Sequence, residues 1–400
     1  MSSNIKDSIN TNRFNNISND FPILGLLALT MTGFTAIMTE TLPAGLLPQM
    51  GKSLEVSESL VGQLVTLYAI GSLIAAIPLI TMTRSWRRRQ LLLISTCGLL
   101  IFNTITALSS NYTLTLIARF FAGVSAGVLW GMIPGYARRM VSDNLKGRSL
   151  AIAMMGVPIA LAFGVPVGTF LGNIIGWRYI FGFMVILNLI LVIWIILKVP
   201  DYQGQSDKSS VSVLSIFKTP GVYSILFVIM TWILSHNIIY TYIHPFLKSL
   251  GMGNHIDLAL FIFGISAIVS IWIVGLFIDR WLRLLVLISI FVFLLDSIIF
   301  GMSINNLIAT YVCTAIWGLT FGGSSTLLST SLANTVPDEG VDIAMSISTT
   351  VWNLAIAGGG LVGGILLKSF GATSFPKVLF ILLIIAFLIA YMAKKHGFTK

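Results

Sequence analysis

Four ionisable side chains stand inside long apolar segments of the sequence: Glu40, Arg119, His236 and Asp296. A charge in the hydrocarbon core of a membrane is expensive, so each of these residues is a functional candidate by default. At a helical rise of 1.5 Å per residue, Glu40 lies about 10 Å from Leu47 and Arg119 lies about 9 Å from Thr113. Leu47 and Thr113 are the segment ends expected at the same face of the membrane. We therefore expect them to meet and to take part in proton uptake and release.

Structural roles are the alternatives for these residues. Glu40 and Arg119 could form a purely structural ion pair. His236 suits either a second proton-sensitive group or a hydrogen-bonded contact between helices. Asp296 is less promising, because the segment around it is expected at the periphery of the fold.

The apolar segments around these residues are long enough to span a membrane. Charged residues make up 10% of the chain, against roughly 25% in an average globular protein, and the mean hydropathy is +0.93. A helix needs about 20 apolar residues to cross a bilayer. Twelve such runs are expected, at 22–47, 60–82, 90–108, 113–137, 149–171, 178–199, 220–247, 256–278, 284–303, 306–333, 342–367 and 376–393. The predicted fold is an all-α integral membrane protein, because the alternating pattern of a membrane β-barrel is missing from the sequence.

Lysine and arginine residues indicate how these helices are oriented. With the N-terminus in the cytosol, 18 of the 24 Lys and Arg residues fall on the cytosolic side, five fall outside, and Arg119 lies within a span. Both termini are therefore expected in the cytosol and the chain in the cytoplasmic membrane. The basic residues do not gather on one soluble face, so the net charge of +10 does not indicate nucleic-acid binding.

The longest polar stretch between spans divides the chain into two halves. We expect a disordered cytosolic tail (1–20), a six-helix half (21–199), a cytosolic linker (200–218), a second six-helix half (219–394) and a cytosolic tail (395–400). A shift of 196 residues superposes equivalent positions of the two halves, such as Glu40 on His236, Arg87 on Arg283, Gly164 on Gly360 and Gly168 on Gly364. Parallel halves in pseudo-twofold arrangement suit a carrier that rocks them about a central site.

Two kinds of motif are candidates for gating. The loops at 84–89 and 275–280 could hold one conformation closed through their charges, and the glycines and prolines of the fifth span could form a flexible seal between the halves. The residues concerned are Arg84, Arg87, Arg88, Gly275, Asp279, Arg280, Gly164, Pro166 and Gly168. Membrane topology is the alternative for the loops, and ordinary helix packing is the alternative for the glycines.

Aromatic and amide side chains on the spans expected near the cavity are candidates for substrate binding. These are Trp130, Asn237, Tyr240, Trp317 and Asn353. They suit sugars, nucleosides or amphipathic drugs alike, and packing between helices is the alternative for each. The sequence offers no metal-ligand spacing and no nucleotide module, so we expect no enzyme activity and no cofactor. The proton gradient is the expected source of energy.

Several motifs together resemble a known family. They are Thr39-Glu40-Thr41-Leu42-Pro43 with the following residues to Pro48, the loop at 81–89, Arg119 with Gly123 and Gly127, Gly164-Val165-Pro166-Val167-Gly168, and Tyr242-Ile243-His244-Pro245-Phe246. Over nearly the whole chain they resemble the major facilitator superfamily, in particular its twelve-span drug:proton antiporter family and the sugar-efflux, arabinose-efflux-permease-like subgroup. The resemblance implies the major facilitator fold, a cavity lined by spans 1, 4, 7 and 10, and proton coupling through Glu40 and Arg119. Thr83 stands where the superfamily usually has an acid.

These features predict a secondary active transporter that exports small organic solutes, such as sugar-like compounds or drugs, by proton antiport and alternating access. Its partners would be the substrate, protons and membrane lipid, and we expect a monomer. Two alternatives share most of these features: a gradient-driven importer of a nutrient, and a transporter-like sensor that does not turn over.

Overall fold

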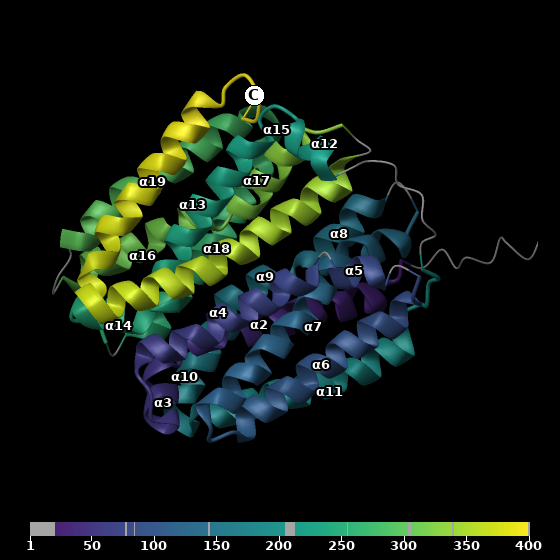
Figure 1. The fold of residues 1–400 in the computed structure, drawn as a ribbon, viewed down its shortest axis with the longest axis horizontal. Coiled ribbons are helices and arrows are strands. Elements are labelled where there is room, and N and C mark those ends of the chain that lie inside the picture. Colours follow the sequence, from purple (N-terminus) through teal and green to yellow (C-terminus); the bar gives the residue numbers. More distant parts are fainter. Residues whose placement is uncertain are drawn as a thin grey trace, which may run out of the picture.

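The computed structural model shows two helical lobes joined along one side (Figure 1). It describes residues 21–398 except 77, 84, 143–144, 205–212, 254, 303–305 and 338–339. The predicted N-terminal tail, Arg84 and the side chain of Asp279 therefore lie outside the described residues. Within the described chain, 12 helical segments are long and apolar enough to cross a membrane, and most of their ends fall within a few residues of the expected limits.

The N-terminal lobe, coloured purple to blue in Figure 1, contains the first six spans. Its helices are α2 (Ile23–Gly45), α3 (Leu47–Leu54), α4 (Glu58–Ala76), α5 (Pro78–Met82), α6 (Arg88–Leu108), α7 (Tyr112–Arg139), α8 (Lys146–Met154), α9 (Gly156–Ile159), the π-helical turn η2 (Ala160–Gly164), α10 (Val165–Ile175) and α11 (Trp177–Lys198). The fifth span runs through α8, α9, η2 and α10.

The C-terminal lobe, coloured green to yellow, contains the other six spans. Its helices are α12 (Val213–Lys218), α13 (Val222–Thr241), α14 (Ile243–Ser249), α15 (Ile256–Met302), α16 (Leu307–Phe321), α17 (Ser324–Ala333), α18 (Val341–Phe370), the 3₁₀ turn η4 (Ala372–Ser374) and α19 (Phe375–Met392). Helix α15 holds two spans and bends between them at Trp281, whose φ of −131° and ψ of 29° are not helical. The described part of the C-terminal tail folds back on this lobe and buries Phe398.

Breaks in the helices occur at related positions of the two halves. Helix α2 ends before Leu46 (φ −116°, ψ 12°), and α13 ends before Tyr242 (φ −111°, ψ 36°). The shift of 196 residues that relates the halves places Leu46 on Tyr242. The short helices that follow, α3 and α14, lie at the same end of the molecule (Figure 1). In the fifth span, Pro166 has no N–H to bond to the carbonyl of Ala162, and the π-helical turn lies there.

The buried apolar side chains show where the lobes are packed together. One cluster joins the C-terminal half to N-terminal residues near α3, such as Leu47 and Val61. A second cluster contains only N-terminal residues nearer the opposite end of the helices, such as Leu29, Leu92 and Ile195. The halves therefore share a core at the end of the molecule that carries α3 and α14, whereas the N-terminal half keeps a separate core toward the other end.

Candidate functional site

Arg119 of α7 is fully buried and connects three helices of the N-terminal half. Its Nη2 donates a hydrogen bond to the main-chain oxygen of Glu40 on α2 at 3.3 Å, and its Nε donates to that of Leu64 on α4 at 3.4 Å. The guanidinium lies 4.8 Å from the centre of the Tyr68 ring and 6.0 Å from that of Phe181, within the range of cation–π attraction. The guanidinium is thus held by carbonyls and aromatic faces in a site closed to lipid.

The structure brings Glu40 and Arg119 together, but their contact is not a direct ion pair. Among the described residues, no nitrogen of a basic group lies within 4.0 Å of the Glu40 carboxylate, and the carboxylate makes no hydrogen bond. The Nη1 of Arg119 is also buried and has no hydrogen-bond partner among these residues. Glu40 and the unpaired Nη1 donor of Arg119 therefore lie close together. Protonation of Glu40 would change the electrostatic attraction between the two side chains.

His236 of α13 lies in a cluster of aromatic rings in the C-terminal half. Nε1 of Trp317 on α16 donates to its Nδ1 at 3.1 Å, so Nδ1 acts as the acceptor and the proton of a neutral ring belongs on Nε2. The Phe321 ring stacks on the imidazole with centres 3.5 Å apart at 3°. Tyr240 and Phe263 complete the cluster at 5.1 and 5.7 Å from the histidine. We call these five residues the aromatic cluster.

The predicted substrate-binding residues do not form one group. Tyr240 and Trp317 belong to the aromatic cluster, whereas the side-chain amides of Asn237 and Asn353 donate to carbonyls of their own helices, at Ile233 and Thr349. Asn237 also packs against Gly359 of α18. Trp130 is half-buried on α7 and approaches Gly33 of α2. The structure therefore assembles two of the five candidates with His236.

Glycines of the fifth span seat the first span within the same half. A Cβ at Gly164 would overlap Met38, and a Cβ at Gly168 would approach Leu42 to 2.7 Å. Pro166 is buried beside them. The same segment also meets the other half, where Gly264 of α15 lies against the main chain of Ala162 and the rings of Phe163 and Phe261 lie 6.1 Å apart. The fifth span therefore packs against the first span and against the C-terminal half.

The two basic loops are anchored to the sixth helix of their own halves. Arg87 Nε contacts an oxygen of Asp201 at 2.5 Å, just beyond α11, and the main-chain N–H of Arg88 donates to the carbonyl of Tyr202 at 2.8 Å. In the second half, Arg283 donates to the carbonyls of Ala390 at 3.2 Å and Tyr391 at 2.8 Å at the end of α19.

Gly275 and Arg280 belong to the loop of the second half. An added Cβ at Gly275 would meet nothing within 4 Å, and the Arg280 guanidinium lies over Trp281 at 5.6 Å. Partial burial raises the pKa of the Asp201 carboxyl. The hydrogen bonds from Arg87 and Arg89 and the charges of these arginines outweigh this effect, so the pKa of Asp201 lies below its usual value. Arg87 and Asp201 thus form a stable surface pair within one half.

Asp296 and the cysteines stand apart from both clusters. Asp296 is 1% exposed on α15 and lies beside the thiol of Cys313 on α16. Cys97 is half-buried and Cys313 is buried, and both are free thiols. Within the described chain, no three His, Cys, Asp or Glu residues are grouped so as to hold a metal ion.

The comparison with protein families agrees with this arrangement of helices. The model of the family described as Major Facilitator Superfamily matches residues 29–359. The chain belongs to this superfamily. The resemblance predicted from the motifs is confirmed, and so is the fold of twelve helices in two six-helix halves. As a facilitator the protein is a multi-pass membrane transporter of small solutes and not an enzyme.

Individual relatives of this facilitator are known. It is 28% identical to the purine ribonucleoside efflux pump NepI of Escherichia coli O1:K1 / APEC over 344 residues, which cover 84% of this chain and 86% of that protein. NepI of Escherichia coli strain K12 is 27% identical over 344 residues, with the same coverage. The solved structure of a D-xylose-proton symporter superposes with a TM-score of 0.79 and 16% identity, covering 94% of this chain and 98% of that one. At that identity the symporter supports the fold alone.

Several residues of this facilitator's site were not selected from the sequence. Tyr68 and Phe263, which line Arg119 and His236, lie on the second and eighth spans and are ordinary aromatic residues of apolar helices. Tyr242 and His244 belong to the motif at 242–246, but the sequence alone indicates no role for either residue. Their partners in the other half become visible only when the helices are placed in space.

Proposed function

We propose that this facilitator exports small organic solutes in exchange for protons, and that Glu40 carries the exchanged proton. The observation that supports this most directly is the fully buried Arg119, whose Nη1 has no hydrogen-bond partner in the described part of the chain although Glu40 lies nearby. Charged residues inside a membrane protein are energetically costly, so they are rare there and usually serve a function. The names of the NepI relatives, which are efflux pumps, support export as the direction.

The geometry suggests how protonation of Glu40 acts on the helices. When Glu40 is ionised, its carboxylate attracts the guanidinium across a low-dielectric interior, where charges interact strongly. When Glu40 is protonated, this attraction disappears and the hydrogen bonds of Arg119 to the carbonyls of Glu40 and Leu64 remain. Protonation thus changes the force between α2, α4 and α7. Such a change biases one of two arrangements of the halves, as alternating access requires.

We assign solute recognition to the aromatic cluster and take purine ribonucleosides as the first substrates to test. The cluster lies on α13, α15 and α16 and combines flat ring faces with the polar atoms of His236 and Tyr240. Flat heterocycles stack on such faces, and the polar atoms orient them. The relatives named as purine ribonucleoside efflux pumps support this choice.

Orientation and state follow from the same proposal. We place both termini in the cytosol, because the excess of Lys and Arg falls at the end of the helices that carries the termini. We also propose that the transporter is a monomer in the cytoplasmic membrane. The end with α3 and α14 is then outside. The shared core near α3 corresponds to a carrier closed to the outside.

Transport in proteoliposomes tests the proposal. With an acidic lumen, an antiporter accumulates a labelled purine ribonucleoside as protons leave, whereas a symporting importer accumulates it only when the lumen is alkaline. A sensor shows neither accumulation nor counterflow. We expect accumulation with the acidic lumen, which Glu40→Gln abolishes while counterflow persists. Asp296→Asn, the same acid-to-amide change at a buried carboxyl outside the site, is the control and is expected to retain transport.

A further inference from the structure

A compact set of hydrogen bonds joins the two halves at the end that carries α3 and α14. Ser59 Oγ donates to the carbonyl of Gly364 at 2.9 Å, and Gln63 Nε2 donates to the carbonyl of Gly360 at 3.3 Å and to Tyr242 Oη at 3.2 Å. Tyr242 Oη also lies 3.3 Å from the carbonyl of Ser59. Closure at this end is therefore polar.

The Tyr242 ring is the centre of this contact. It is fully buried at the break between α13 and α14, and its hydroxyl is 2.7 Å from the carbonyl of Gly360. A Cβ at Gly62 of α4 would overlap the ring atoms Cε1 and Cζ. A Cβ at Gly363 or Gly364 of α18 would approach the same ring to 2.7 and 2.6 Å. The ring thus lies in a seat of glycines, of which one belongs to the opposite half.

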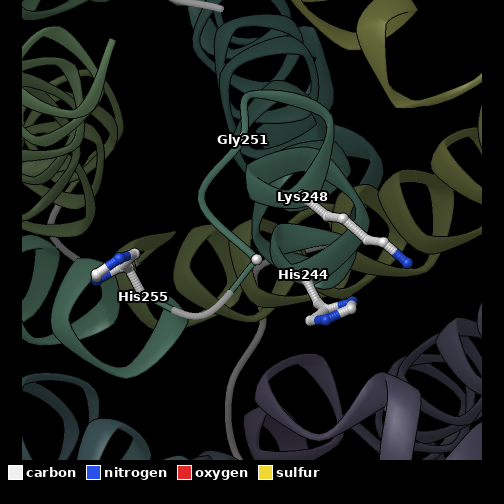
Figure 2. A pocket seen from close by; sticks show the side chains of 5 residues that line it. His244, Lys248, Gly251 and His255 are labelled. Carbon is white, nitrogen blue, oxygen red and sulfur yellow. The ribbon is translucent and has the colours of Figure 1, made fainter. Parts of the chain in front are cut away.

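A second contact between the halves lies next to the seat. His244 Nδ1 is 3.1 Å from Glu58 Oε2, and their side chains are 13% and 28% exposed. Glu58 stands four residues before Gly62 and so on the same face of α4. His244, Lys248 and His255 line a cavity of about 400 Å³. Figure 2 shows His244 and Lys248 on one side of it and His255 on the other. Water can reach the Glu58–His244 contact, so the contact can break and re-form.

We propose that Tyr242 in its glycine seat is the outer gate of this transporter, and that the Glu58–His244 contact is its latch. The inference rests on the proposed alternating access, because a gate has meaning only if this end opens. The seat joins α4 to α13 and α18, so that the halves cannot separate here until the ring leaves Gly62. Most of the bonds across the halves go to main-chain carbonyls, which a side chain can leave without stranding a charge.

Cysteine accessibility tests the gate independently of transport. Thr66 is 3% exposed on α4 and faces Gly360, so Thr66→Cys in a background with Cys97 and Cys313 replaced by alanine reports opening of this interface. A membrane-impermeant maleimide is added from the outer face. We expect slow labelling in the parent and labelling about tenfold faster in Gly62→Ala, because the added methyl excludes the ring and shifts the population toward the open state.

Matched variants separate the gate from general damage. Gly182→Ala adds the same methyl where it meets nothing within 4 Å, and it is expected to label at the parent rate. Glu58→Gln and His244→Gln should each raise labelling a few-fold, and the double variant should resemble the singles, because both remove the same contact. Tyr242→Phe keeps the ring in its seat but removes the hydroxyl, so it should give an intermediate rate even if Gly62→Ala does not fold.

The outcomes are distinct for the gate and for the proposed function. If Gly62→Ala, Glu58→Gln and Tyr242→Phe all label at the parent rate, the gate proposal is wrong, whatever the protein transports. If labelling changes as expected but an acidic lumen drives no accumulation, the gate holds and proton-driven export is wrong. Equal acceleration by Gly182→Ala would also overturn the assignment, because it would show that any added methyl loosens the helices.

Discussion

The two halves of this transporter share their helix breaks but differ in what stands at them. Leu46 and Tyr242 occupy equivalent positions with similar backbone angles. Leu46 packs on Gly172 within its own half, whereas Tyr242 reaches Gly62 of the other half and hydrogen-bonds across the interface. An aliphatic side chain contributes packing alone. A phenol adds directional bonds, so the same backbone break becomes a contact between the halves on one side only.

The central positions differ in the same way. Glu40 and His236 are equivalent under the shift of 196 residues, yet Glu40 stands beside a buried arginine and His236 stands among stacked rings. A carboxylate near a guanidinium suits a change of charge. A neutral imidazole held by a tryptophan N–H suits contact with a flat solute. We infer that the repeat places the two sites at one level, and that the substituted residues assign the proton to one half and the solute to the other.

The largest predicted effect distinguishes these two sites. Glu40→Gln should reduce accumulation with an acidic lumen to the level of protein-free liposomes, because the amide cannot exchange a proton. His236→Gln should keep the dependence on the pH gradient and alter mainly the solute concentration at half-maximal rate. Initial rates against solute concentration, with and without the gradient, measure both. Loss of coupling in both variants would show that the halves do not divide the work.

Removing Arg119 should impair both folding and coupling. Arg119→Leu leaves the carbonyls of Glu40 and Leu64 without their donor and takes the counter-charge from Glu40. The combined Glu40→Gln/Arg119→Leu variant should be less impaired than the sum of the single variants, with a coupling energy of about 1 kcal/mol. Rates corrected for the amount of folded protein measure this. Strict additivity would indicate that the two residues act independently.

A smaller effect is expected for the aromatic cluster. Trp317→Phe keeps the ring but removes the donor to His236 Nδ1, which costs about 1 kcal/mol for a buried hydrogen bond. We expect weaker solute binding with unchanged proton coupling. Tyr311→Phe, a change at a half-buried ring of the same helix outside the cluster, is the control. Unchanged affinity in Trp317→Phe would remove the cluster from recognition.

The smallest effects compare the two basic loops. Arg283 makes three hydrogen bonds to carbonyls near the C-terminus, whereas Arg87 pairs with Asp201 at the surface. Arg283→Gln should therefore lower the melting temperature more than Arg87→Gln, since an exposed pair contributes at most about 1 kcal/mol. Thermal unfolding in detergent measures the difference, and an equal decrease for both would contradict it.

The pair in the first loop should also depend on pH. The pKa of Asp201 is lowered in the folded protein, so its contribution is present above the ordinary aspartate pKa of about 3.9 and is lost as the pH falls through the lower folded value. The gap in melting temperature between the parent and Asp201→Asn should therefore be constant near neutral pH and close below about pH 4. A gap that closes near pH 6 would point to another group.

The sequence predicted the site less completely than the fold. Apolar length is a local property, and it was enough to predict spans such as Ile23–Gly45. It also singled out Glu40, Arg119 and His236 as candidates, because they are ionisable residues within those spans. Which face of a helix meets which neighbour depends on its rotation and on contacts far along the chain. For this reason the glycines of the fifth span were ambiguous between a seal and packing, and the partners of Tyr242 were not foreseen.

The sequence by itself determined that the chain crosses a membrane twelve times, in two related halves, with few ionisable residues inside. The reason is that each span in lipid must form its own backbone hydrogen bonds and exclude charged side chains, and both requirements are visible in the composition and length of the segment. Only the tertiary structure decided that Arg119 binds carbonyls rather than the Glu40 carboxylate, and that Tyr242 closes on Gly62. Those contacts join residues up to 180 positions apart, and their geometry depends on how whole helices pack.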